Sequence, residues 1–113
     1  MLTVEILKEY GADTDDGISR CMGNESLYLR LVSSVVGQTE FEDLERYICA
    51  GDLKKAFESA HALKGVLGNL SLTPLYEKIC EITDLLRVQT DMDYKPLLEQ
   101  ISGLRDEIKN MIE

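Results

Sequence analysis

The sequence predicts an all-α protein, an antiparallel up-and-down four-helix bundle with short N-terminal helices packed on it. Nearly every segment repeats its apolar residues with a period of about 3.6, and none alternates as a strand would. The connections between the long amphipathic helices are short, which favours antiparallel neighbours. With 113 residues, 44% of them hydrophobic, the chain predicts one domain, residues 1–113, with a core of its own.

Two short helices are predicted first. One covers residues 2–9 and stops at Gly11. The acidic run 13–16 then supplies an N-cap at Asp13 and first-turn carboxylates for a second helix, which continues through Met22 and ends at Gly23. These two helices are too short to span the bundle, so we expect them to pack against it.

The next apolar stripe, from Leu27 to about Ala50, belongs to a helix that Asn24 can cap. Gly37 interrupts this stripe, and the pair Thr39 and Glu42 has the spacing of a capping box that would start a new helix. Both a single kinked helix and two separate helices fit the pattern.

The remaining turns are marked by capping residues. Asp52 is a good N-cap for a helix that runs to about Leu70. Thr73 is predicted to cap the next helix, with Pro74 at its first position, and this helix extends to about Gln89.

The last helix is predicted to be capped by Asp93, with Pro96 tolerated in its first turn. Its apolar residues recur at helical spacing and form one face. That buried face consists of Tyr94, Leu97, Leu98, Ile101, Leu104, Ile108 and Met111.

Charge and composition exclude several classes of function. The net charge of −9 argues against binding to nucleic acid or to an anionic membrane surface. No apolar run approaches the roughly 20 residues of a membrane span, and the charged N-terminus is unlike a secretory signal, so a cytoplasmic protein is expected. Cys21, Cys49 and Cys80 are far apart and odd in number, so we expect reduced thiols that act as small hydrophobic residues, with no metal site and no cofactor.

His61 is the only histidine, and it lies on an unusual helical stripe. On a helical wheel of about 100° per residue, its direction lies roughly 130° from the centre of the apolar face of its helix. Lys64, Gly65 and Gly68 lie within about 60° of it. The wheel predicts a solvent-facing imidazole beside a cation and bare backbone. An ordinary surface histidine does not explain two glycines, each of which costs a helix roughly 1 kcal/mol relative to alanine.

The chemistry that fits this stripe is phosphoryl acceptance. A neutral imidazole nitrogen can attack phosphorus at cytosolic pH, and phosphoryl transfer depends mainly on positioning and charge neutralisation. Lys64 can place its ammonium beside the phosphoryl oxygens, while Gly65 and Gly68 leave room for a partner. Because the sequence has no nucleotide-binding loop and no carboxylate metal cluster, we expect no autonomous kinase activity.

Apolar residues near the histidine have two interpretations. Phe57, Ala62 and Val66 are candidates for the apolar part of a docking surface. Phe57 and Val66 fit equally well as residues at the rim of the core.

The run 60–65, Ala-His-Ala-Leu-Lys-Gly, resembles the H-x-[LIF]-K-G signature of histidine-containing phosphotransfer (HPt) domains of the small bacterial type. The stretches 11–20 and 23–28 are similar to the opening of such domains, and Gly51-Asp52 before the motif helix is also typical. The likeness covers roughly residues 10–90. One departure is Ser71-Leu72, where many members have Gly-Ala or Gly-Leu; because serine is small, we expect the turn to survive.

The resemblance implies a four-helix bundle whose phosphorylated histidine, His61, exchanges its phosphoryl group with the aspartate of response-regulator receiver domains. It makes Lys64 the stabilising cation and Gly65 the point of access, and it matches Arg87 to a second basic residue near the site in some members. It assigns no fixed role to Gly68. Any Mg²⁺ in the reaction would belong to the receiver.

The resulting functional prediction is a monomeric intermediate of a two-component phosphorelay, with a receiver domain or a hybrid sensor kinase as partner. The alternative is a helical adaptor that binds a receiver or kinase without transferring phosphate. A third reading is a domain cut from a larger sensor kinase; family-like sequence soon after Met1 favours a free-standing protein.

Overall fold

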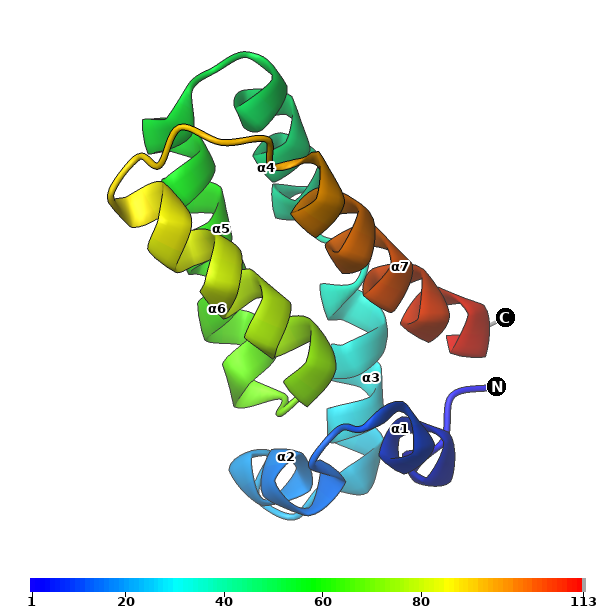
Figure 1. Cartoon of the computed structure of the whole chain (residues 1–113). Helices are drawn as coiled ribbons and strands as arrows, with labels where there is room; N and C mark the ends of the chain where they lie inside the picture. Colours follow the sequence, from blue (N-terminus) through cyan, green and yellow to red (C-terminus); the bar gives the residue numbers. More distant parts are fainter. Residues whose placement is uncertain (113) are drawn as a thin grey trace.

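The computed structural model describes residues 1–112. These residues form seven α-helices and no strand, which confirms the all-α prediction (Figure 1). The helices are α1 (Val4–Tyr10), α2 (Thr14–Arg20), α3 (Glu25–Val35), α4 (Glu40–Cys49), α5 (Leu53–Asn69), α6 (Thr73–Arg87) and α7 (Lys95–Ile112).

Helices α4, α5, α6 and α7 form the bundle, with α3 continuing beyond α4 at one end (Figure 1). The chain reverses direction at the short turns between α4 and α5 and between α5 and α6. Apolar side chains from α3 to α7 fill the interior; on the apolar face of α5, Ala56, Ala60, Leu63 and Leu67 are buried, whereas Leu53 is partly exposed. The fully buried residues include Tyr28, Val32, Leu44, Ala56, Ala60, Leu63, Leu67, Leu75, Ile79, Ile82, Leu86 and Ile108.

The stripe that the sequence left open forms two helices, α3 and α4. Arg105 of α7 holds the break between them: its Nε donates to the Val36 carbonyl at 2.7 Å, and its guanidinium pairs with Glu42 at 3.0 Å. The predicted capping box is wrong. Thr39 keeps helical backbone angles (φ −67°, ψ −18°) and its side chain caps nothing, because a capping side chain needs the extended conformation.

Three predicted N-caps are confirmed: Asp13, Asn24 and Asp52 each accept a hydrogen bond from the backbone N–H three residues on. The predicted cap at Thr73 is wrong by one residue. Thr73 is itself the first residue of α6, and its hydroxyl donates to the Ser71 carbonyl at 3.3 Å instead of capping the helix.

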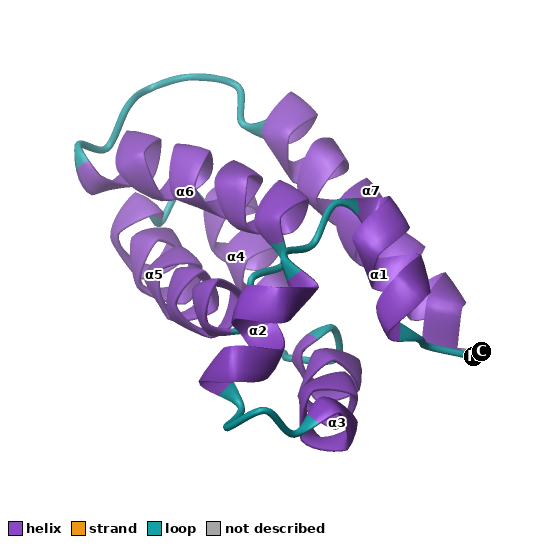
Figure 2. Cartoon of the chain, turned by 90° about the horizontal axis from the view of Figure 1, so that it is seen from below, coloured by secondary structure: helices purple, strands orange, loops and turns teal. Residues whose placement is uncertain are grey.

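The N-terminal helices pack against one end of the bundle (Figure 2). Helix α1 lies beside α7, where the Tyr10 hydroxyl donates to the Leu104 carbonyl at 3.1 Å. Helix α2 covers the turn between α5 and α6: Asp13 N–H donates to the Ser71 carbonyl at 3.0 Å, and the Ser71 hydroxyl donates to the Asp16 carboxylate at 2.5 Å. The turn that ends the histidine helix is therefore fixed from outside the bundle.

Gly17 allows α2 to approach this closely. A Cβ at Gly17 would lie 2.4 Å from a ring carbon of Tyr28 and 2.8 Å from the Leu70 carbonyl oxygen. The Tyr28 hydroxyl donates to that same carbonyl at 2.9 Å. Any side chain at position 17 would force α2 away from the bundle.

The three cysteines are free thiols. Cys21 is buried and Cys80 half-buried, as expected of small hydrophobic residues, but Cys49 is exposed because it closes α4 next to the turn at Gly51. Within residues 1–112, no cluster of three or more His, Cys, Asp or Glu side chains could hold a metal ion. None of the helices described is both long and apolar enough to cross a membrane.

Candidate functional site

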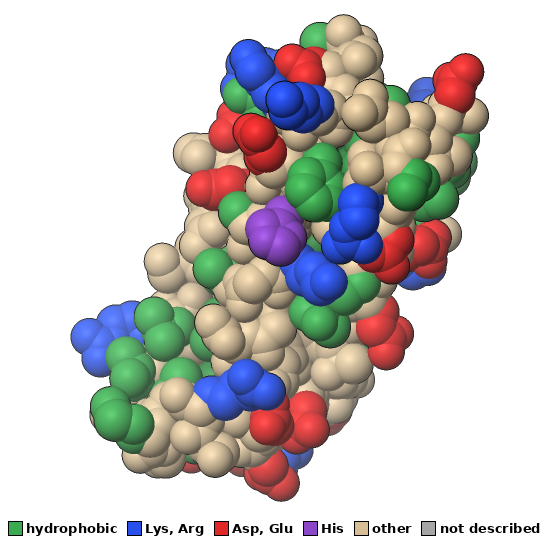
Figure 3. Space-filling view, turned by 90° about the vertical axis from the view of Figure 1, so that its left-hand side faces the viewer, with side chains coloured by type: hydrophobic (Ala, Val, Ile, Leu, Met, Phe, Trp, Pro, Cys, Tyr) green, Lys and Arg blue, Asp and Glu red, His purple; other side chains and the backbone are tan. Residues whose placement is uncertain are grey.

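His61 lies on the outer face of α5, flanked in sequence by the exposed Ala62 and the buried Ala60. Ala60 and Leu63 fix the inner face of this helix against the bundle, so the imidazole faces solvent, as the helical wheel predicts. Figure 3 shows it at the molecular surface, with hydrophobic side chains and several lysine and arginine side chains beside it. The local surface is therefore less acidic than the net charge of the chain suggests.

The imidazole of His61 stacks on the ring of Phe57, one helical turn earlier, with ring centroids 5.7 Å apart and planes inclined by 21°. The Arg87 guanidinium carbon lies 5.7 Å from the centroid of the same ring. Arg87 also pairs with Asp84 at 2.8 Å. The predicted second basic residue is thus at the rim of the site, but part of its charge is already neutralised.

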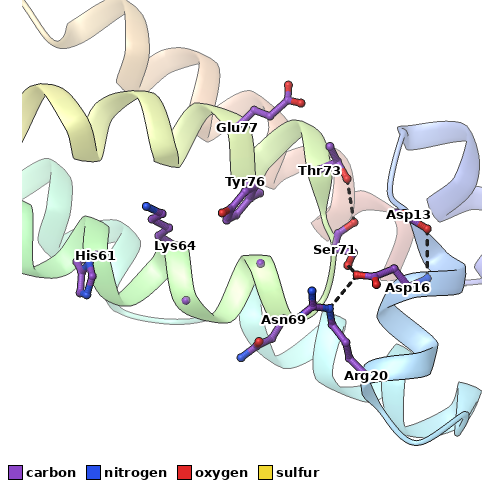
Figure 4. A pocket seen from close by; sticks show the side chains of 12 residues that line it. Asp13, Asp16, Arg20, His61, Lys64, Asn69, Ser71, Thr73, Tyr76 and Glu77 are labelled. Carbon is purple, nitrogen blue, oxygen red and sulfur yellow. Dashed lines mark hydrogen bonds and ion pairs between the residues drawn. The ribbon is translucent and has the colours of Figure 1, made fainter.

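Lys64 projects from the same helix, one turn after His61 (Figure 4). It is half-buried, and its ammonium forms no ion pair with any carboxylate in the described part of the chain. Its ammonium is therefore free to meet an incoming anion, unlike the guanidinium of Arg87, which Asp84 already neutralises in part.

The two glycines of the stripe differ in what surrounds them. A Cβ at Gly65 would meet no atom within 4 Å, so this position leaves open space beside the imidazole. A Cβ at Gly68 would lie 3.0 Å from a ring carbon of Tyr76. The space that Gly68 clears is therefore taken mainly by the α6 tyrosine.

A surface groove of about 600 Å³ begins at His61 and extends along α5 to α2 (Figure 4). Lys64, Gly65 and Gly68 line it, whereas Phe57 and Arg87 do not. The sequence reasoning missed its other lining residues, which come from α2 and its N-cap, from the last residue of α5 and the turn after it, and from α6: Asp13, Asp16, Arg20, Asn69, Ser71, Thr73, Tyr76 and Glu77. Only Tyr76 left a signal in the sequence, because Gly68 leaves room for a side chain from a neighbouring helix.

At the far end of the groove, Asp16 is held in its charged form. Hydrogen bonds from Ser71 and then from Arg20 lower the pKa of this carboxyl group. Arg20 Nε lies 2.8 Å from the carboxylate. The groove thus joins an unpaired ammonium near the imidazole to a set of polar groups on α2.

The imidazole is thus exposed on α5 and is reached through an open groove. Residues 37–113 match the family model of the Hpt domain. The chain belongs to this family, whose domains take part in histidine phosphotransfer in two-component phosphorelays as phosphoryl carriers that interact with receiver domains or kinases. The match begins at Gly37, so α1–α3 lie outside it. Neither a search of curated proteins nor one of solved structures found a match.

Proposed function

We propose that this protein accepts a phosphoryl group on His61 and exchanges it reversibly with the aspartate of a response-regulator receiver domain. The observation that carries the proposal is the imidazole itself: exposed on α5, at the start of the groove, and without a hydrogen bond to either ring nitrogen among the described residues. A nitrogen that donates to no neighbour and accepts from none is available as a nucleophile.

In the proposed step, an unprotonated ring nitrogen of His61 attacks the phosphorus of the receiver's aspartyl phosphate. The new N–P bond forms as the P–O bond to the aspartate breaks, and the aspartate leaves as a carboxylate. The ring keeps its other N–H proton and releases it to solvent afterwards. The reverse reaction uses the same groups, so the direction of flow depends on the partner.

The remaining site residues support this step. Lys64 supplies positive charge to the phosphoryl oxygens, and its lack of a carboxylate partner favours that role. Gly65 leaves the approach to the imidazole open. Gly68 lines the groove with its backbone, and the ring of Tyr76 packs against it. Arg87 adds a more distant positive charge that it shares with Asp84.

The partner is expected to bring the rest of the chemistry. We infer that Mg²⁺ is bound by the receiver's acidic site, that this chain needs no cofactor, and that it has no kinase activity of its own. We further propose that it acts as a monomer in the cytoplasm.

The test is to mix the purified protein with a receiver domain phosphorylated on its aspartate, in the presence of Mg²⁺, and to measure acid-labile phosphate on this chain. We expect label on the wild type and none on His61→Gln. Lys64→Gln should be labelled about tenfold more slowly, the effect of roughly 1.4 kcal/mol in the transition state. Circular dichroism verifies that each variant is folded.

The same experiment decides against the proposal if His61→Gln takes up phosphate as the wild type does. A folded wild type that binds receivers tightly and independently of phosphate, but is never labelled, would instead identify the non-transferring adaptor.

A further inference from the structure

One feature of the site is not explained by the reaction: what holds the imidazole in place. A nucleophilic or basic histidine is usually oriented by a hydrogen bond from one ring nitrogen to a carboxylate or a backbone carbonyl. His61 has no such bond in the described part of the chain; instead, its ring stacks on that of Phe57. Without that ring, the side chain would be free to rotate at the surface.

The stack has the geometry of a favourable aromatic contact. The centroids are 5.7 Å apart with an angle of 21° between the planes, within the range of offset-stacked rings. The Phe57 ring is half-buried and is itself covered by the Arg87 guanidinium at 5.7 Å, which Asp84 holds at 2.8 Å. Phe57 is therefore a supported ring and not a freely moving one.

Phe57 and Gly65 lie four residues before and four residues after His61, so they are its two neighbours along one stripe of α5. One neighbour is an aromatic ring and the other has no side chain. The groove lies on the Gly65 side of the imidazole, since Gly65 lines it and Phe57 does not. The imidazole thus has a solid surface on one side and open space on the side from which a partner can approach.

We propose that Phe57 is a positioning residue: it fixes the rotamer of His61 by stacking, so that a ring nitrogen is presented toward the groove before the receiver binds. This inference rests on the proposed phosphoryl transfer. A preset orientation raises the rate of the transfer step and leaves the affinity for the receiver unchanged, because the rotational freedom is already lost in the free protein.

The experiment compares Phe57→Leu with Phe57→Tyr, which keeps a ring. Tyr47→Leu is the matched control, since Tyr47 is another half-buried aromatic residue with cations over its ring, and it does not stack on His61. Single-turnover transfer from a phosphorylated receiver is measured over a range of receiver concentrations. For Phe57→Leu we expect the rate at saturating receiver to fall about tenfold, with an unchanged half-saturating concentration. Phe57→Tyr and Tyr47→Leu should transfer at the wild-type rate.

Two further measurements separate positioning from damage. Phosphoramidate, a small phosphodonor that can reach the imidazole in any rotamer, should label Phe57→Leu as fast as the wild type. In NMR spectra, the His61 ring protons of the wild type and of Phe57→Tyr should show an upfield ring-current shift that Phe57→Leu loses.

The inference is overturned if Phe57→Leu transfers normally, if Phe57→Tyr fails to restore the rate, or if only the half-saturating concentration rises, since the last result would define a docking contact. These outcomes are distinct from failure of the proposed function, in which the wild type itself would take no label from the phosphorylated receiver.

Discussion

At the scale of single residues, the site has been kept open at some cost to the helix that carries it. Gly65 lies within α5, exposed, with nothing near the place of its missing Cβ. Packing does not require a glycine there, and a glycine within a helix costs about 1 kcal/mol relative to alanine. We therefore infer that the glycine serves to keep His61 accessible.

Replacing Gly65 separates these two effects. Gly65→Ala should raise the free energy of unfolding by about 1 kcal/mol and slow phosphoryl transfer from a receiver, because the new methyl group lies beside the approach to the imidazole. Gly103→Ala is the matched control: Gly103 is an exposed glycine within α7 whose Cβ would also meet nothing. It should stabilise equally and leave transfer unchanged. Urea denaturation measures the stability of each variant, and the transfer assay measures its rate. A stabilised Gly65→Ala with full activity would show that the glycine is not needed for access to His61.

Sequence reasoning reached much of the site at this scale. The exposure of His61 and the grouping of Lys64 and Gly65 beside it follow from helical period alone. The stack of Phe57 on His61 does not, because period fixes the direction of Cβ and not the rotamer. Phe57 was accordingly predicted only as a docking or rim-of-core residue.

At the scale of elements, the turn between α5 and α6 depends on an unusual serine. Ser71 has φ +53°, in the left-handed region that favours glycine. Its hydroxyl bonds the Asp16 carboxylate and its carbonyl accepts from Asp13 N–H, so α2 stabilises the conformation. This explains how the departure from the glycine of related domains is tolerated.

Two substitutions at Ser71 test this explanation. Ser71→Ala and Ser71→Gly both lose the hydroxyl, but only glycine relaxes the left-handed backbone, so Ser71→Gly should be about 1 kcal/mol more stable than Ser71→Ala. Ser71→Ala should also unfold at a lower urea concentration than the wild type, because it loses the hydrogen bond to Asp16 without relaxing the backbone. Equal stability of the two variants would show that the backbone at this turn is not strained.

The hydrogen bond to Asp16 also has a pH dependence with a definite sign. In the folded protein the pKa of the Asp16 carboxyl group is lowered from 3.8. The contribution of this carboxylate to stability is therefore present above pH 3.8 and is lost as the pH falls toward the lowered pKa. The difference between the wild type and Ser71→Ala, measured by urea unfolding, should therefore shrink below pH 3.8. A difference that stays constant in acid would place the effect elsewhere.

Helix boundaries were predictable where a local capping residue decides them, as at Asp13 and Asn24. Helix boundaries were not predictable where a residue far away in the sequence determines them. The division between α3 and α4 depends on Arg105, whose hydrogen bond to the Val36 carbonyl spans 69 residues of sequence. No pattern within the stripe itself contains that information.

At the scale of the whole molecule, Tyr28 connects the N-terminal helices to the bundle. Burial, and then the charges of Cys21 and Asp13, raise the pKa of this phenol from 10.0 to about 12. Because ionisation is harder in the folded state, its contribution to stability is complete below pH 10 and is lost as the pH rises from 10 to about 12.

Alkaline unfolding should report this residue. Tyr28→Phe should cost about 1 kcal/mol at pH 7, where it removes the hydrogen bond to the Leu70 carbonyl. Between pH 10 and 12 its free energy of unfolding should fall less steeply than that of the wild type, since one buried phenol fewer can ionise. Urea titrations at several pH values provide the comparison, and parallel curves would exclude Tyr28 as the titrating group. Tyr10, whose pKa burial also raises, accounts for part of the slope that remains.

The helical class of the whole molecule followed from the sequence, because a helical period in almost every segment leaves few alternatives. The position of α2 did not follow. The hydrogen bond between Asp16 and Ser71 joins residues 55 apart, and it brings Asp16 to the groove that starts at His61.

The close approach of Gly17 to Tyr28 also constrains how this protein can change over evolutionary time. With only 2.4 Å between a Cβ at position 17 and the aromatic ring, neither residue can be replaced alone by a larger one without displacing α2. A descendant that keeps α2 in this position must therefore keep Gly17, which also approaches the Leu70 carbonyl oxygen, whereas Tyr28 can change to a ring of the same size or smaller. We therefore expect a glycine at this position in relatives that share the N-terminal arrangement, and no such restriction in those that share only the bundle.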